Sequence, residues 1–176
     1  RCQSVHINPT YDQESVSWLS QNIDKEVRTD FDALQLLEGA HGVPFKAIED
    51  LEGDYFFQYQ NWQNQLLEIA INPTRVNETE LFDGNELQVL SCLQQLLTEG
   101  IKLKVLKYDS ANLELNKVIE KTSQRYLFKL LDDTSRAIAL SKTTVNMKLL
   151  LDNVLIVWSH ITHLKHYPTI THTQEF

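Results

Sequence analysis

The sequence predicts a helix-rich mixed α/β fold, in which amphipathic helices pack on a small mixed sheet. Three observations predict it: leucines recur at helical spacing, residues 101–105 alternate apolar residues with lysine, and glycine (5) and proline (4) are scarce. Scarce turn-formers argue against a sandwich or barrel of many short strands. The alternative is a mostly α-helical bundle with a minor β element.

The segment 85–108 is the centre of this prediction. Residues 85–99 predict an amphipathic helix with one leucine stripe: Leu87, Leu90, Leu93 and Leu97. Gly100 is expected to end the helix in the left-handed conformation. Residues 101–108 then predict a strand whose solvent face carries Lys102 and Lys104.

A lone strand leaves its backbone groups unpaired, so the strand at 101–108 needs neighbours. Residues 66–71 (LLEIAI) fit either a strand or a helix, and the need for a neighbour favours the strand. Segments 126–131 and 136–142 can pair as a hairpin across the turn-forming residues 132–135. In the alternative interpretation these two segments are helical.

The other segments predict helices. In the N-terminal part, residues 12–28 and 29–39 predict an αα-hairpin, Pro44 begins a short helix over 45–51, and a further helix begins at Tyr55. Residues 113–121 and 147–161 predict two more helices, and residues 3–8 a short strand.

The length of 176 residues predicts a single globular domain over residues 1–168. The helical hairpin within residues 1–43 is expected to pack on this domain, and residues 169–176 are expected to form a flexible tail. The longest apolar run is too short to cross a membrane, and the two cysteines do not form a disulfide pattern. An intracellular location, cytoplasmic or nuclear, is therefore expected.

Two surfaces are candidates for binding a protein partner or a second copy of the chain. One is the aromatic segment, where Tyr55, Tyr59 and Trp62 follow helical spacing. The other is the lysine face of Lys102 and Lys104. The net charge of −8 argues against broad nucleic-acid binding, because the chain repels phosphate backbones.

A histidine-rich segment is the main candidate for chemistry. His160, His163 and His166 lie at three-residue spacing, where neighbouring side chains of a helix can share a metal ion. With Asp132 and Asp133 they define an alternative function, a metal-dependent phosphoester hydrolase that uses zinc or magnesium.

Known nucleotide-binding and catalytic motifs are missing from the sequence. It has no Gly-x-Gly-x-x-Gly, no P-loop, no Gly-x-Ser-x-Gly and no Cys-x-x-Cys pattern. The leading hypothesis is a non-catalytic protein-interaction or regulatory module without a cofactor, a subunit of a larger intracellular assembly.

Overall fold

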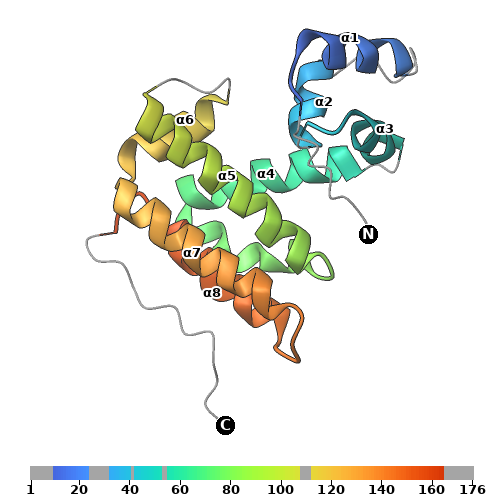
Figure 1. The fold of residues 1–176 in the computed structure, drawn as a ribbon. Helices are drawn as coiled ribbons and strands as arrows, with labels where there is room; N and C mark the ends of the chain where they lie inside the picture. The colour runs from blue at the N-terminus through green and yellow to red at the C-terminus, as the bar shows by residue number, and fades with distance from the viewer. Residues whose placement is uncertain (1–9, 24–31, 41, 53–54, 108–111, 165–176) are drawn as a thin grey trace, which may run out of the picture. The chain divides into compact units, whose positions relative to one another are not determined.

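A computed structural model describes residues 10–23, 32–40, 42–52, 55–107 and 112–164, and all regular structure in these ranges is helical (Figure 1). The chain divides into two compact units, Arg1–Gln60 and Asn61–Phe176. Helix α4, Tyr55–Ile71, begins in unit 1 and ends in unit 2. The predicted single domain over residues 1–168 stays a prediction.

Unit 1 contains α1 (Gln13–Asn22), α2 (Ala33–Gly39), α3 (Pro44–Glu52) and the start of α4. The first three helices pack against one another pairwise. Their shared core is apolar: Leu19, Ile23, Ala33, Leu36, Leu37, Ala40, Ala47, Leu51 and Phe56. The helices expected within 12–28, 29–39 and 45–51 are therefore confirmed, although α1 ends at Asn22.

Local capping explains where α1 begins and α2 ends. Asp12 accepts a hydrogen bond from the Ser15 backbone N–H at 2.7 Å, and this bond lowers the pKa of the Asp12 carboxyl. Gly42 has a φ of 74° and donates its N–H to the Leu37 carbonyl at 2.8 Å. This left-handed residue lets the chain reverse into α3, whose first residue is Pro44, as predicted.

Unit 2 contains the rest of α4 and five further helical segments. These are the 3₁₀ helix η1 (Pro73–Phe82), α5 (Glu86–Leu106), α6 (Leu113–Lys121), α7 (Gln124–Leu140) and α8 (Met147–Ser159). Helix α5 packs against α6, α7 and α8, and α7 and α8 lie side by side (Figure 1). Helix α5 is therefore the central element of unit 2.

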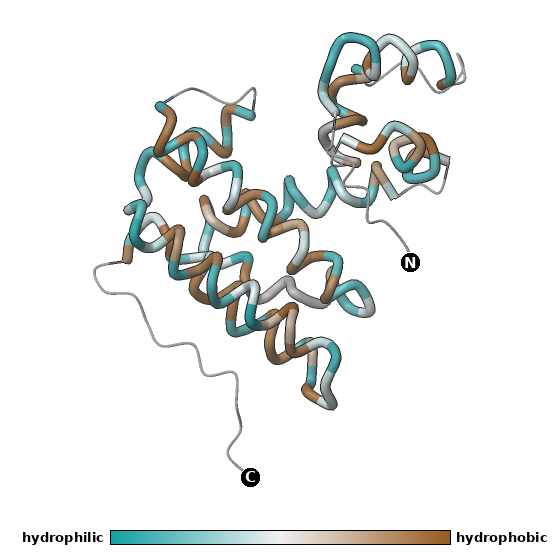
Figure 2. Tube along the Cα trace, viewed as in Figure 1, coloured by the Kyte–Doolittle hydropathy of each residue, from teal (hydrophilic) through white to brown (hydrophobic). Residues whose placement is uncertain are grey.

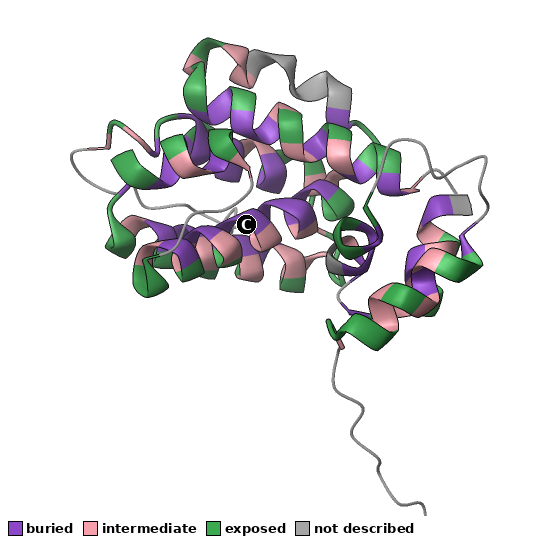
Figure 3. Cartoon of the chain, turned by 90° about the horizontal axis from the view of Figure 1, so that it is seen from above, coloured by how far each residue is buried: buried purple, intermediate pink, exposed green. Residues whose placement is uncertain are grey.

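Buried apolar residues recur along the helices of unit 2, although some apolar side chains, such as Leu106 and Ile156, are exposed. Figure 2 shows hydrophilic and apolar residues alternating along the helices, and Figure 3 shows buried residues in stripes with exposed residues opposite them. This is the arrangement that a 3.6-residue period requires. Among the described helices, none combines the length and the apolar character needed to span a bilayer.

The mixed α/β prediction is wrong, because residues 101–105 belong to α5 and not to a strand. Gly100 does not end the helix. It is buried, and an added Cβ would lie 2.3 Å from Ile119 Cδ1, so α5 and α6 lie in close contact at Gly100. The left-handed residue that ends α5 is Lys107, with a φ of 55°.

The hairpin predicted over residues 126–142 is also wrong, because these residues lie in α7 and in the turn that follows it. The hydroxyls of Thr134 and Ser135 each donate to the carbonyl four residues earlier, at 2.7 Å. Such bonds satisfy hydroxyl groups inside a helix, so these turn-favouring residues fit there. Gln94 of α5 also donates to the Ser135 hydroxyl at 3.0 Å, which joins α5 to α7.

The strand predicted at residues 66–71 is wrong for a third reason. This apolar run continues α4, and its buried residues, such as Leu66 and Ala70, belong to a helix. Trp158 of α8 donates its indole N–H to the Leu66 carbonyl at 2.6 Å. The alternative of a mostly α-helical bundle fits, but its minor β element is not found in the described residues.

The helices expected at residues 113–121 and 147–161 are confirmed as α6 and α8. The strand expected at residues 3–8 and the tail expected at residues 169–176 lie outside the described residues.

Candidate functional site

The predicted aromatic face contributes mostly to packing. Tyr59 is 8% exposed and Trp62 is 5% exposed, so both side chains are buried. Tyr55 is half-buried, with its ring 6.4 Å from the ring of Tyr59 and the Lys46 ammonium 5.4 Å from its own ring centre. Buried aromatic rings stabilise a fold and offer little surface to a partner.

The predicted lysine face divides into two different environments. Lys102 is exposed on α5. Lys104 is half-buried, and its ammonium donates to the carbonyls of Ile119 and Glu120 at 2.9 and 3.0 Å. These carbonyls lie in the last turn of α6, where the helix dipole favours a cation. Lys104 therefore caps α6.

We expect Lys104→Met to lower the free energy of unfolding by about 1 kcal/mol, because it removes a charged donor from the end of α6. Urea unfolding followed by circular dichroism measures this loss. Lys102→Met is the matched control, and its effect is expected within about 0.5 kcal/mol. Equal effects of the two substitutions would contradict the capping role of Lys104.

The residues of the metal hypothesis lie on two helices and their ends. Asp132 and Asp133 are in the middle of α7, whereas His160 follows the last residue of α8 and His163 lies just beyond it. His160 and His163 are exposed, and the His163 N–H donates to the His160 carbonyl at 2.9 Å. His166 lies outside the described residues. Where side chains are described, no three His, Cys, Asp or Glu residues form a group that could hold a metal ion.

Unit 1 carries an exposed aromatic patch that the sequence did not predict, formed by Tyr11, Trp18, Val43 and Phe45. The rings of Trp18 and Phe45 lie 4.9 Å apart, at 59° to each other. The Thr10 N–H donates to the Gly42 carbonyl at 3.1 Å, which brings the chain before Tyr11 to the chain before Val43. Phe45 is 74% exposed, Tyr11 53% and Val43 44%.

The surroundings of the aromatic patch are acidic. Glu14 precedes Trp18 by one helical turn and Glu49 follows Phe45 by one turn, and both carboxylates are exposed. Among the described side chains of unit 1, five are acidic: Asp12, Glu14, Asp32, Glu49 and Asp50. The basic one among them, Lys46, pairs with Asp50 at 2.6 Å. The described side chains of unit 1 therefore carry a net negative charge, which favours a cationic partner.

The position of Phe45 on α3 is the signal that could have revealed the aromatic patch. Ala47 and Leu51 of α3 are buried. At 100° per residue, Phe45 lies about 200° from Ala47 around the helix. A large apolar residue opposite the buried stripe of a short helix must be covered by something else or be exposed.

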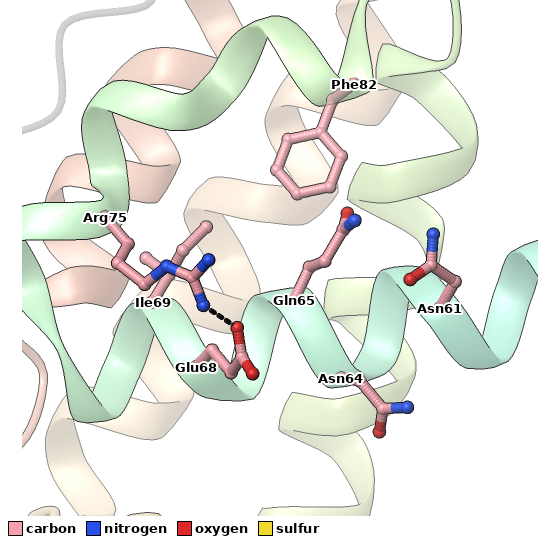
Figure 4. Close-up of a pocket in the computed structure, with 7 residues that line it drawn as sticks. All are labelled: Asn61, Asn64, Gln65, Glu68, Ile69, Arg75 and Phe82. Carbon is pink, nitrogen blue, oxygen red and sulfur yellow. Dashed lines mark hydrogen bonds and ion pairs between the residues drawn. The ribbon is translucent and has the colours of Figure 1, made fainter.

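Unit 2 has a polar pocket of about 220 Å³ between α4 and η1 (Figure 4). Its lining residues are Asn61, Asn64, Gln65, Glu68, Ile69, Arg75 and Phe82. Glu68 and Arg75 form an ion pair at one end. Gln65 extends from α4 toward Phe82 at the other end.

Comparison with known proteins gave no match to a protein-family model, to a curated sequence or to a solved structure.

Proposed function

We propose that this chain is a non-catalytic protein-interaction module, a subunit of a larger assembly, and that it binds its partner through the aromatic patch. The observation that supports this function best is Phe45, a phenylalanine that is 74% exposed and packs against Trp18. Clustered aromatic side chains on a surface are typical of the anchoring residues of protein interfaces.

The charge around the patch defines the chemistry of the partner. An apolar anchor would cover Phe45 and Trp18, and lysine or arginine residues beside it would face Glu14 and Glu49. Opposite charges at the rim of an interface accelerate association and exclude partners of the same charge. The partner segment that fits is therefore an amphipathic one, apolar on one side and basic on its flanks.

We also assign this interaction to an intracellular compartment. The sequence has two cysteines, Cys2 and Cys92, and no pattern of a disulfide framework. So few cysteines fit a reducing environment, where disulfides are rare.

A pair of designed helical peptides tests the proposal. One carries leucine on its apolar face and lysine on its polar face, and the other replaces every lysine by glutamate. We expect the leucine–lysine peptide to bind in calorimetry, more weakly as salt is raised, and the leucine–glutamate peptide not to bind. Phe45→Ala should weaken binding of the leucine–lysine peptide about tenfold, because it removes the most exposed anchor.

Phe128→Ala is the matched control, since Phe128 is 44% exposed but lies on α7 in unit 2. Equal binding by the wild type and both variants would contradict a role of the aromatic patch. Light scattering of the wild type and Phe45→Ala tests whether the patch binds a second copy of the chain instead. A dimer that only the wild type forms would show that the partner is this second copy.

The alternative, a metal-dependent phosphoesterase, makes a different prediction. It requires zinc or magnesium at stoichiometric amounts in the purified, untagged protein, and loss of that metal in the double variant His160→Ala/His163→Ala. Elemental analysis of both proteins measures this. Stoichiometric metal with phosphoesterase activity that the double variant lacks would replace the interaction function.

A further inference from the structure

The polar pocket of unit 2 is built by one stripe of α4. Asn61, Asn64, Gln65 and Glu68 lie at positions i, i+3, i+4 and i+7, so they share one face of the helix. Opposite them, the two ends of η1 contribute Arg75 and Phe82 (Figure 4). Three of the four residues in the stripe carry primary amides, which both donate and accept hydrogen bonds.

Gln65 has an unsatisfied hydrogen-bonding atom. Its Oε1 is buried and has no hydrogen-bond partner among the described residues. Buried polar atoms are almost always paired in folded proteins, because an unpaired one costs stability. An exception in the wall of a cavity marks a position where an outside group can supply the missing bond.

A single water molecule does not account for the size of this cavity. A water molecule needs roughly 10–15 Å³ of cavity volume. The pocket offers about 220 Å³. A ligand that extends over several heavy atoms therefore fits between Gln65 and the ion pair.

The charge of the pocket selects a neutral ligand. Glu68 and Arg75 pair with each other, so their charges cancel within the lining. A charged ligand would have to separate this pair, whereas a neutral amide can bond to Gln65 and Asn61 and leave it intact. Phe82 and Ile69 add apolar contacts for the carbon atoms between two amides.

We propose that this pocket binds neutral amide groups, namely the backbone of an extended peptide segment of a partner protein. The peptide N–H donates to Gln65 Oε1, and the peptide carbonyl accepts from an asparagine amide of the stripe. This site is separate from the aromatic patch, which belongs to unit 1, and its existence does not depend on the function of that patch.

N-acetyl-alanine N′-methylamide is the probe, since it carries two peptide bonds and no charge. We expect it to shift the side-chain amide signals of Asn61 and Gln65 saturably in ¹H–¹⁵N spectra, with a Kd on the order of 1 mM, as for a small ligand. The corresponding methyl ester lacks one N–H and should bind at least fivefold more weakly. Propanamide, a neutral primary amide without a peptide bond, tests the other source of an amide, a carboxamide side chain. Stronger binding of propanamide than of the probe would overturn recognition of a peptide backbone.

Gln65→Leu removes the unpaired acceptor while keeping a similar size. We expect it to weaken binding of the probe at least tenfold, while Gln88→Leu, the same change on the exposed face of α5, leaves binding unchanged. The midpoint of thermal unfolding gives a second measurement. Because the substitution removes an unsatisfied atom, Gln65→Leu should unfold at the same or a higher temperature than the wild type.

Two results would overturn the proposal. One is the absence of saturable shifts with the probe. The other is an unfolding temperature of Gln65→Leu well below that of Gln88→Leu, which would make Gln65 a structural residue. Neither result affects the binding of the leucine–lysine peptide, so failure of this site and failure of the aromatic patch are distinguishable.

Discussion

Replacing Trp158 by alanine should lower the free energy of unfolding by about 3–5 kcal/mol, the cost typical of deleting a large buried aromatic side chain. Trp158 is completely buried. Its indole N–H donates to the Leu66 carbonyl at 2.6 Å, across 92 positions of the chain, and joins α8 to α4. The substitution therefore removes apolar contacts, leaves a cavity and breaks this bond together. Urea unfolding followed by circular dichroism measures the loss.

Trp158→Phe measures the contribution of the hydrogen bond separately from that of the buried ring. Phenylalanine keeps a large apolar ring but has no N–H, so we expect a loss of about 1–3 kcal/mol. Trp18→Phe is the control, because Trp18 is only partly buried in unit 1 and should change stability by about 0.5 kcal/mol or less. A loss of less than about 0.5 kcal/mol for Trp158→Phe would show that the hydrogen bond to Leu66 does not stabilise unit 2.

The helices that could be predicted from the sequence have their own start and stop signals. Helix α3 begins at Pro44, and α6 and α8 begin after Asn112 and Asn146, whose side chains accept from the backbone at 3.1 and 3.3 Å. The apolar residues of α6, Leu115, Val118 and Ile119, are all buried. In these segments the local pattern and the tertiary packing agree.

Most of the wrong predictions come from residues whose role depends on a distant helix. Gly100 is of a residue type that often ends helices, but here it makes room for Ile119 of α6. Lys104 belongs to an alternating segment typical of an edge strand, but its ammonium reaches the end of α6. Ser135 is of a residue type that favours turns, but its hydroxyl forms hydrogen bonds within α7 and with Gln94 of α5. One sequence window does not contain these partners.

The candidate sites also depend on contacts between segments that are distant in the sequence. The helical spacing of aromatic residues indicates Tyr59 and Trp62, which the fold buries. The spacing on α3 indicates that Phe45 is exposed, but Trp18 lies beside it only because α1 packs against α3. The amides of α4 that line the pocket follow a helical spacing in the sequence, but the opposite wall comes from η1, a segment for which the sequence analysis predicts no helix or strand. The exposure of a residue, unlike its spacing, depends on the whole fold.

Gly100→Leu should lower the free energy of unfolding by about 3 kcal/mol, at the upper end of overpacking costs. An added Cβ would lie 2.3 Å from Ile119 Cδ1 and 3.0 Å from its Cγ1, so α6 has to move away from α5. Helix propensity works in the opposite direction, since leucine is favoured over glycine by about 0.8 kcal/mol. Lys102→Leu, on an exposed position of the same helix, is the control and should stay within about 0.5 kcal/mol of the wild type.

A double-mutant cycle with Gly100→Ala and Ile119→Val tests the contact itself. Valine lacks the Cδ1 atom that meets the new Cβ, so alanine should fit better beside it. Gly100→Ala alone should cost about 1 kcal/mol, the excess of overpacking over the helix propensity gained. In the Ile119→Val background this cost should fall by more than half, because only the 3.0 Å contact with Cγ1 remains, giving a coupling of about 0.5 kcal/mol or more. Additive effects would mean that α6 does not lie against Gly100. Coupling would establish that Ile119 of α6 limits the size of the residue at position 100.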